Sequence, residues 1–364
     1  MKINNKMNKK LSYKLSTKTF KVISLLIAAV MILASFTACT IKEKNNDVNN
    51  DANNDASTSN TISNTISNTI SNTISNNKDA TFPLTVKDAK GTEMTIEKKP
   101  SKIVSINSTA DEMLLSLVEE NRIAAISHIS TDPGTSNVVE KAKNIPVKAK
   151  MEPESLIALQ PDLVIVADWT DDNAVKQLRD AKLVVYALAT PSNIEQVKQA
   201  VTELANLVGE EQKGKDVITW MDSKLKPIND KIKTLKDDQK AKALYWDSFN
   251  CVYGKGSSFD AVCKNAGVIN MASEAGMEMW VEIGKEDIID MNPDVLFLPS
   301  WSFEGFDAEK FTNDFKNDKS LADLNAIKND RIFNLPNEHM VSTSQYMVLA
   351  VEDMAKAVYP ELFK

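Results

Sequence analysis

Two kinds of hydrophobic pattern alternate along most of the chain. Short runs that are apolar throughout predict strands of a parallel sheet covered on both faces. Stretches in which apolar residues recur every three or four positions predict amphipathic helices. The predicted strands cover 102–106, 123–127, 163–167, 183–187, 241–246, 295–298 and 331–335, and the predicted helices cover 109–118, 171–181, 193–208, 259–266 and 343–358. This alternation predicts an α/β fold.

A repeat without gaps divides the pattern into two halves. The segment 154–169, ESLIALQPDLVIVADW, parallels the segment 286–301, EDIIDMNPDVLFLPSW, and its Glu, Pro, Asp and Trp recur at an offset of 132 positions. Each copy predicts a short helix, a Pro-Asp turn and a buried strand. A period this long indicates duplicated lobes, because the repeating units of a solenoid are much shorter.

A long charged stretch with helical spacing, 211–236, separates the two halves. We therefore predict two Rossmann-like α/β lobes, 82–210 and 239–364, joined by a long rigid α-helix within 211–238. Pro227 lies inside this connector, where proline is expected to kink the helix or split it in two. In the first lobe, Ser108 or Thr109 is the expected N-cap of the first helix.

The first 38 residues have the pattern of an export signal. Seven lysines and no acidic residue precede an apolar run, Val22–Phe36, of about 15 residues, which is short for a membrane-spanning helix of about 20. The run leads into Thr37-Ala38-Cys39, which resembles a bacterial lipobox. We expect lipidation, including palmitate, at Cys39 and anchoring to the cell membrane. The alternative is a membrane anchor followed by an incidental cysteine.

Residues 39–81 predict a disordered tether. They are mostly Asn, Asp, Ser and Thr, with four copies of Ser-Asn-Thr-Ile between Ser59 and Ile74, and cannot bury a core. As a random coil the tether would span roughly 35 Å. Beyond the signal the chain has 36 basic and 50 acidic side chains, a net charge of about −14. This charge excludes binding to nucleic acid through general electrostatics.

Two further cysteines, Cys251 and Cys263, follow the tether. They are too few for a disulfide scaffold. They either pair in an oxidising exterior or remain buried thiols, and the sequence leaves both readings open.

Four segments together resemble a known family. They are 100–112 (PSKIVSINSTADE), 154–162, 211–236 and 286–294, and they span essentially the whole chain beyond residue 82. The chain resembles the Fe/B12-type periplasmic-binding family, the class III solute-binding proteins of ABC importers. The resemblance implies an extracytoplasmic lipoprotein, expected to be a monomer, that delivers an Fe(III)-siderophore or haem to a permease dimer with its ATPase. A corrinoid such as cobalamin is the alternative ligand.

The repeated glutamates, Glu154 and Glu286, match the positions at which this family carries its permease-docking carboxylates. Two carboxylates on separate lobes suit pairing with arginines on two permease subunits, which fixes orientation more than affinity. The alternative is a solvated glutamate favoured by the dipole of its helix.

The ligand is expected between the lobes, beyond the carboxyl ends of the strands. Tryptophan rings suit a broad ligand, although some of them belong to the core in the simpler reading. Met151 with His339 or Tyr346 would allow haem ligation, although a methionine beside a helix start more often packs. The candidate ligand-binding residues are Asn107, Ser108, His128, Met151, Trp169, Trp246, Trp280, Trp301, His339 and Tyr346.

Other classes of protein fit the sequence less well. Zinc or manganese capture typically needs several histidines, and the chain has two. The nucleophile elbow, Walker loop and His-Glu-x-x-His motifs of enzymes are absent from the sequence. A surface sensor or adhesin without a transporter remains a third reading. With three arginines in all, and Lys148 and Lys150 as the nearest basic residues, the cleft favours neutral hydroxamate complexes, haem or a corrinoid over anionic catecholates.

Overall fold

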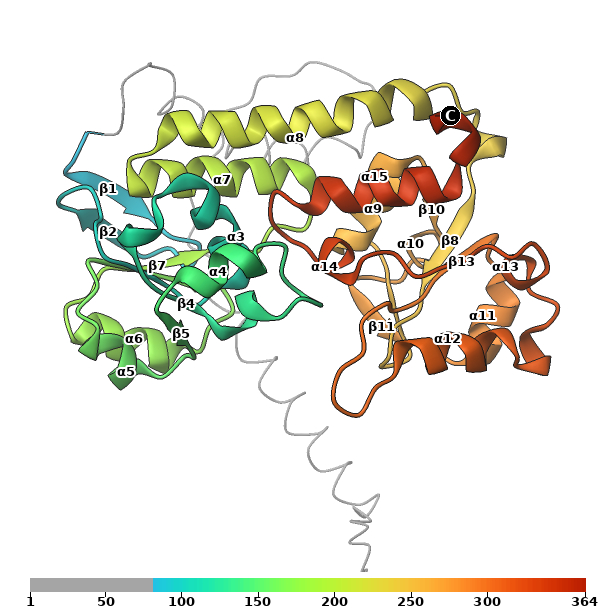
Figure 1. Cartoon of the computed structure of the whole chain (residues 1–364), viewed down its shortest axis with the longest axis horizontal. Helices are drawn as coiled ribbons and strands as arrows, with labels where there is room; N and C mark the ends of the chain where they lie inside the picture. Colours follow the sequence, from blue (N-terminus) through green and yellow to red (C-terminus); the bar gives the residue numbers. More distant parts are fainter. Residues whose placement is uncertain (1–80) are drawn as a thin grey trace, which may run out of the picture. The chain divides into compact units, whose positions relative to one another are not determined.

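The computed structural model describes residues 81–364, which form two α/β lobes and a long helix (Figure 1). The predicted export signal, the lipidation site Cys39 and all but the last residue of the predicted tether lie outside the described residues. Within 81–364, no helix combines the length and the apolar character needed to cross a membrane.

The first lobe contains a five-stranded parallel sheet with the order β5-β4-β3-β6-β7. An antiparallel hairpin of two strands, β1 and β2, precedes it. The strands are β1 (Leu84–Lys87), β2 (Glu93–Ile96), β3 (Ile103–Ser105), β4 (Ile123–Ser127), β5 (Val147–Ala149), β6 (Leu163–Ala167) and β7 (Val185–Leu188). The helices are α3 (Ser108–Leu117), α4 (Val139–Asn144), α5 (Pro153–Ala158), α6 (Asp172–Asp180) and α7 (Ile194–Val208), with short 3-10 turns η1 (Glu120–Arg122) and η2 (His128–Thr131).

The second lobe contains a four-stranded parallel sheet with the order β10-β8-β12-β13 and a separate antiparallel pair, β9 and β11. The strands are β8 (Lys242–Tyr245), β9 (Cys251–Tyr253), β10 (Ile269–Asn270), β11 (Trp280–Glu282), β12 (Val295–Phe297) and β13 (Ile332–Phe333). The helices are α9 (Ser258–Ala266), α10 (Met271–Glu274), α11 (Lys285–Met291), α12 (Ala308–Lys316), α13 (Asn325–Lys328), α14 (Asn337–Met340) and α15 (Met347–Val358), with short 3-10 turns η3 (Asp237–Gln239), η4 (Lys319–Leu321) and η5 (Pro360–Phe363).

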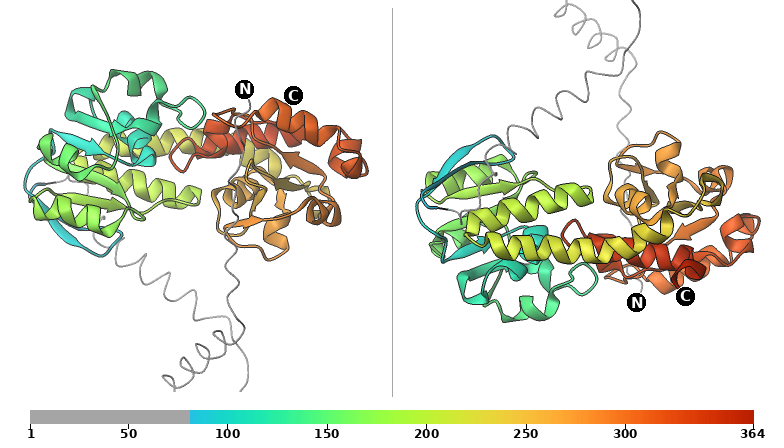
Figure 2. Two further views of the ribbon diagram at one scale, coloured as in Figure 1. Left: turned by 90° about the horizontal axis from the view of Figure 1, so that it is seen from below. Right: turned by 90° about the horizontal axis from the view of Figure 1, so that it is seen from above.

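The connector α8 (Glu211–Ile232) packs against α7 of the first lobe and α15 of the second (Figures 1 and 2). It is one continuous helix through Pro227, so the predicted split at this residue is wrong. The helix ends at Ile232, four residues before the predicted end. Gly214 permits the close approach of α8 to α7, since a Cβ on Gly214 would lie 2.6 Å from the Cβ of Ala205.

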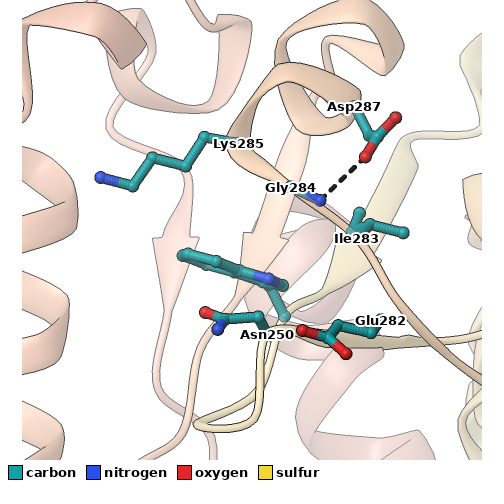
Figure 3. A pocket seen from close by; sticks show the side chains of 7 residues that line it. Asn250, Glu282, Ile283, Gly284, Lys285 and Asp287 are labelled. Atoms are coloured by element: carbon teal, nitrogen blue, oxygen red, sulfur yellow. Dashed lines mark hydrogen bonds between the residues drawn. The ribbon is translucent and has the colours of Figure 1, made fainter. Parts of the chain in front are cut away.

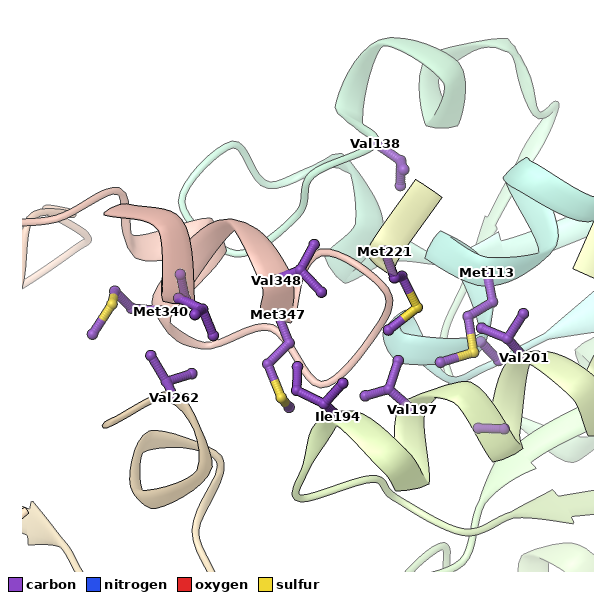
Figure 4. Close-up of a cluster of buried hydrophobic side chains, with 14 of the residues drawn as sticks. Met113, Val138, Ile194, Val197, Val201, Met221, Val262, Met340, Met347 and Val348 are labelled. Atoms are coloured by element: carbon purple, nitrogen blue, oxygen red, sulfur yellow. The ribbon is translucent and has the colours of Figure 1, made fainter. Parts of the chain in front are cut away.

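One hydrophobic core passes from the first lobe into the second. It includes Ile194 and Val197 of α7, Met221 of α8, and Met340 and Met347 of the second lobe (Figure 4). All five side chains are buried. Because a well-packed apolar core resists opening, this shared cluster, which includes residues of the connector, holds the two lobes together.

Most predicted elements agree with the structure. The apolar run Leu163–Ala167 is a strand buried at every position, and α7 begins at the cap Asn193 and ends at Gly209 in the left-handed conformation, as its pattern indicates. Two boundaries need correction. Asn107, rather than Ser108 or Thr109, caps α3 by accepting from the backbone N of Thr109 and Ala110. The last long helix, α15, begins at Met347 rather than 343.

Candidate ligand-binding cleft

Each parallel sheet has a point at which the chain changes direction. In the first sheet, β4 and β5 lie on one side of β3, and β6 and β7 lie on the other. In the second sheet, β10 lies on one side of β8, and β12 and β13 lie on the other. In open α/β sheets such switch points leave a crevice beyond the carboxyl ends of the strands, where ligands bind. The topology therefore places one candidate binding edge on each lobe.

Segments that follow these carboxyl ends bring the two lobes into contact. Gly134, in the loop after β4, lies beneath Trp301, in the loop after β12, so closely that a Cβ on Gly134 would lie 2.1 Å from the indole ring. The side-chain Nδ2 of Asn337 donates to the backbone O of Gly134 at 2.7 Å. The carboxyl edges of the two sheets therefore face a common junction.

Four large apolar side chains are exposed in segments that follow strands of the two sheets. Trp169 follows β6 and is 77% exposed, and Phe249 follows β8 and is 64% exposed. Ile129 follows β4 and Phe303 follows β12, with 44% and 50% exposure. Soluble proteins rarely leave grouped apolar surface in water unless it binds something. The concentration of such residues at equivalent edges of both lobes marks a candidate cleft for an apolar or aromatic-faced ligand.

The four candidate tryptophans occupy different environments. Trp169 and Trp280, the latter 58% exposed at the start of β11, are open to a ligand. Trp246 is 5% exposed and packs against Phe311 and Phe315, and its Nε1 has no hydrogen-bond partner among residues 81–364. Trp301 is half-buried against Gly134.

The polar candidates of the first lobe differ in availability. The Asn107 side chain is buried and used as the cap of α3, whereas Ser108 is half-buried. His128 opens η2 directly after β4 and is exposed. Among these three residues, His128 presents the most accessible polar group at the carboxyl edge.

The residues considered for haem ligation all make internal contacts. Met151 is half-buried and packs against the core of the first lobe. The Tyr346 ring meets Trp220 edge-on at 5.8 Å between centroids. His339 Nδ1 lies 2.6 Å from Oδ2 of Asp353. Burial disfavours the His339 imidazolium, but the carboxylates of Asp353, Glu338 and Glu112 together outweigh burial and raise the pKa of His339.

A pocket of about 480 Å³ lies beside Trp246 in the second lobe. Asn250 and Glu282 line one side of it and Lys285 and Asp287 the other (Figure 3). Oδ2 of Asp287 accepts a hydrogen bond from the backbone N of Gly284 at 2.8 Å, which caps α11. The polar lining makes this pocket a candidate for the polar periphery of a ligand rather than its apolar body.

Two consecutive buried acids lie on α3, behind the edge of the first lobe. Oδ2 of Asp111 accepts hydrogen bonds from Ser127 N at 2.8 Å and Ser130 Oγ at 2.6 Å, and so supports the turn that carries His128. Burial raises the pKa of Asp111 to about 7, although these hydrogen bonds oppose the shift. Burial likewise raises the pKa of Glu112.

Glu154 and Glu286 both lie in the first turn of a short helix, α5 and α11, and both are exposed. Neither carboxylate is buried at the lobe junction, so both are accessible to a large partner. This placement agrees with docking and equally with the simpler interpretation of a solvated glutamate at a helix start.

The structure also settles the state of the remaining cysteines. Cys251 on β9 and Cys263 on α9 are both buried free thiols. Burial raises the pKa of both thiols. Within residues 81–364, no group of three or more His, Cys, Asp or Glu side chains could hold a metal ion.

Sequence reasoning missed three exposed apolar residues at the edge, Ile129, Phe249 and Phe303. Each follows a predicted strand, so their positions carry a signal. Their exposure could not be predicted from the sequence, because it depends on which side chains cover them in the folded lobe.

The fold has two α/β lobes, each with a parallel sheet, joined by one long helix. Apolar side chains are exposed in the segments that follow the carboxyl ends of both sheets. These features define a class III substrate-binding protein. A family model described as periplasmic binding protein matches residues 103–339, more than half of the chain. The chain belongs to this periplasmic binding protein family, a class of solute-binding proteins.

Three relatives indicate the setting in which such proteins act. The uncharacterized ABC transporter substrate-binding lipoprotein YvrC of Bacillus subtilis (strain 168) is 27% identical, over 79% of this chain and 89% of the relative. A cobalamin-binding protein of Halobacterium salinarum (strain ATCC 29341 / DSM 671 / R1) is 22% identical, over 60% of this chain and 59% of the relative. The probable siderophore-binding lipoprotein YfiY of B. subtilis is 25% identical, over 67% and 77%.

A solved structure supports the fold. The molybdate periplasmic binding protein MolA of Haemophilus influenzae, bound to molybdate, superposes with a TM-score of 0.66 at 18% identity, over 77% of this chain and 92% of MolA. The family match and the relatives, rather than this likeness of fold, indicate a substrate-binding component of the kind that works with an ABC importer.

Proposed function

We propose that this protein captures a bulky iron complex, a ferric siderophore in the first place, and delivers it to the permease dimer of an ABC importer. The observation that carries this proposal is the exposure of Trp169, Phe249 and Phe303 at the carboxyl edges of both lobes. Small oxyanions are bound by compact polar groups, whereas exposed rings suit a ligand with a large apolar surface.

The charges of the structure favour a neutral complex over a strongly anionic one. All three arginines are engaged elsewhere: Arg122 with Glu210, Arg179 with Asp88, and Arg331 with the backbone O of Val358. Of the two lysines nearest the edge of the first lobe, Lys148 donates to the backbone O of Ile145 and Lys150 is exposed. A ferric hydroxamate needs no cluster of cations to balance its charge.

Haem is the weaker candidate, and a corrinoid ranks second to a siderophore. Met151, Tyr346 and His339 would have to leave their present contacts to ligate haem iron. The exposed imidazole of His128 and the exposed rings would suit a corrinoid, which is the second candidate. The Halobacterium relative, which is named a cobalamin-binding protein, also supports a corrinoid.

Delivery requires a membrane-bound partner. We propose that Glu154 and Glu286 pair with arginines of the permease and that Cys39 carries the lipid that anchors the protein to the extracytoplasmic face of the membrane. The relatives named lipoproteins of ABC transporters support this placement. A sensor or adhesin with the same lobes would bind ligand but would not stimulate a permease.

Titration with a panel of ligands tests the proposal. Quenching of tryptophan fluorescence is measured for a ferric trihydroxamate, a ferric tricatecholate, haemin, cyanocobalamin and molybdate. The proposal expects the trihydroxamate to bind at least tenfold more tightly than the tricatecholate or molybdate, a difference of about 1.4 kcal/mol. Tight binding of molybdate alone, or binding of none of the five ligands, contradicts the proposal. Tightest binding of cyanocobalamin would show that the ligand is a corrinoid.

A further inference from the structure

One buried carboxylate, Glu112 on α3, is shared between the two lobes. Glu112 is 4% exposed. Oε1 accepts hydrogen bonds from the backbone N of Asn137 at 2.7 Å and from its side-chain Nδ2 at 3.0 Å. Oε2 accepts hydrogen bonds from the hydroxyls of Ser344 and Ser342, the latter at 3.4 Å. Oε1 therefore accepts hydrogen bonds from the first lobe, and Oε2 accepts hydrogen bonds from the second lobe.

Neighbouring contacts reinforce the same junction. The backbone O of Glu112 accepts from Nε2 of Gln345 at 2.8 Å, and the hydroxyls of Thr109 and Thr343 lie 2.5 Å apart. The segment Ser342–Gln345, which precedes α15, is thus tied to α3 along its length. Because its polar groups are buried, each unmade hydrogen bond would carry a desolvation cost of about 1–3 kcal/mol.

The loop Asp132–Asn137, which we call the bridging loop, connects this junction to the cleft. At one end Asn137 binds Glu112 and donates through Nδ2 to the backbone O of Glu338 at 2.9 Å. Three residues earlier in the loop, Gly134 lies beneath Trp301. A shift of Asn137 would therefore move the segment on which Trp301 rests.

We propose that Glu112 is a positioning residue that fixes the separation of the two carboxyl edges by holding the bridging loop and Ser342–Gln345 to one carboxylate. Glu112 acts through these two segments and does not contact the ligand. Each lobe retains its own sheet and an apolar cluster of its own without Glu112, so loss of the carboxylate loosens one lobe against the other at this junction. This inference goes beyond the proposed function and holds for any ligand.

Hydrogen exchange of the full-length, ligand-free protein tests this role. In Glu112→Ala, we expect exchange in 132–138 and 342–346 to increase at least tenfold, with β3, β6, β8 and β12 unchanged. Glu112→Gln keeps an acceptor for Asn137, and its amide can donate to Ser344, so its exchange in both segments should stay within about threefold of the parent protein.

Asp111→Ala is the matched control. It removes the neighbouring buried acid, whose partners Ser127 and Ser130 both belong to the first lobe. Its exchange should rise at 127–131 and stay unchanged at 342–346. If Glu112→Ala leaves 342–346 protected, or raises exchange equally throughout both sheets, the positioning role is wrong.

A second variant covers the case in which Glu112→Ala fails to fold. Ser342→Ala/Ser344→Ala removes the partners in the second lobe and leaves the bonds to Asn137 in place. It should increase exchange in 342–346 without affecting β8 and β12. Unchanged protection of 342–346 in this variant would also overturn the proposal.

Discussion

At the residue scale, burial separates tryptophans that are available to a ligand from those that support the fold. Trp246 lies among Phe311 and Phe315, and its replacement would leave a cavity in the second lobe. Trp169 and Trp280 have little protein around them and contribute little to folding. Ligand contact is therefore the function that their size and exposure favour.

Replacement of the exposed tryptophans should affect binding and not stability. We expect Trp169→Ala and Trp280→Ala each to weaken binding of the ligand found by titration about tenfold, or about 1.4 kcal/mol. The free energy of unfolding should change by less than about 0.5 kcal/mol. Ile289→Ala is the matched control, because Ile289 is an exposed apolar residue on α11, away from the strand ends. Equal losses of affinity in all three variants would contradict the assignment.

Asp111 should make stability depend on pH. Burial raises its pKa from 3.8 to about 7, so the folded protein holds a proton that the unfolded chain releases above pH 4. Its stabilising contribution is therefore complete below about pH 4 and is lost as pH rises to about 7, with a slope of at most about 1.4 kcal/mol per pH unit. Glu112 shifts in the same direction.

Asp111→Asn removes this titration and keeps an oxygen that accepts from Ser127 and Ser130. Between pH 4 and 7, its free energy of unfolding, measured with urea, should fall less steeply than that of the parent protein. Parallel curves for the two proteins would show that Asp111 is already ionised at acid pH.

At the element scale, the connector shows how tertiary packing overrides local propensity. Pro227 lacks the N–H that would bond to the backbone O of Ser223, yet α8 continues through it because Leu225 and Ile228 are buried on either side. Pro227 itself is exposed. The residue therefore weakens the helix without ending it.

Pro227→Ala should stabilise the protein. An interior proline costs about 3 kcal/mol relative to alanine, and its stiffening of the unfolded chain returns up to about 1 kcal/mol. We expect an increase of about 2 kcal/mol in the free energy of unfolding, seen as a higher urea midpoint. Lys226→Ala, at the exposed neighbouring position, should change it by less than about 0.5 kcal/mol. A lower midpoint for Pro227→Ala would mean that α8 requires the proline.

The strands and long helices could be predicted because their signals are local. Apolar runs such as 163–167 and caps such as Asn193 are visible in the sequence. The pair β9 and β11 could not be predicted, since its strands are separated by 26 residues and are only three residues long each. For the site, the strand ends were predictable. The pairing of His339 with Asp353 depends on how α14 packs against α15, and that of Glu112 with Ser344 depends on packing between segments 232 residues apart.

At the scale of the whole molecule, the shared core and the contacts at Glu112 leave the lobes little freedom to separate. We therefore expect the protein to present a permease with nearly the same outline with and without ligand. Recognition then depends on surface groups that do not contact the ligand, among which Glu154 and Glu286 have equivalent places on the two lobes.

Replacement of both glutamates should separate delivery from capture. In Glu154→Ala/Glu286→Ala, ligand affinity should remain within about threefold, which is less than 1.4 kcal/mol. Transport into vesicles and ATP hydrolysis by the reconstituted importer should fall more than in either single variant, because each charge pair helps to fix the docked orientation. Glu309→Ala, an exposed glutamate in the first turn of α12, is the control. If the double variant loses ligand binding while transport of bound ligand is normal, these carboxylates belong to the ligand site.

The claim that the paired carboxyl edges hold a metal chelate is tested most directly by the ligand that the protein carries. The full-length protein is isolated from its native membranes in mild detergent, and its absorption spectrum and metal content are measured. We expect a broad ferric charge-transfer band and close to one iron per protein, and we expect Trp169→Ala to carry less. A protein without a chromophore or bound metal, which also takes up none of the ferric hydroxamate, haemin or cobalamin offered to it, would contradict the account.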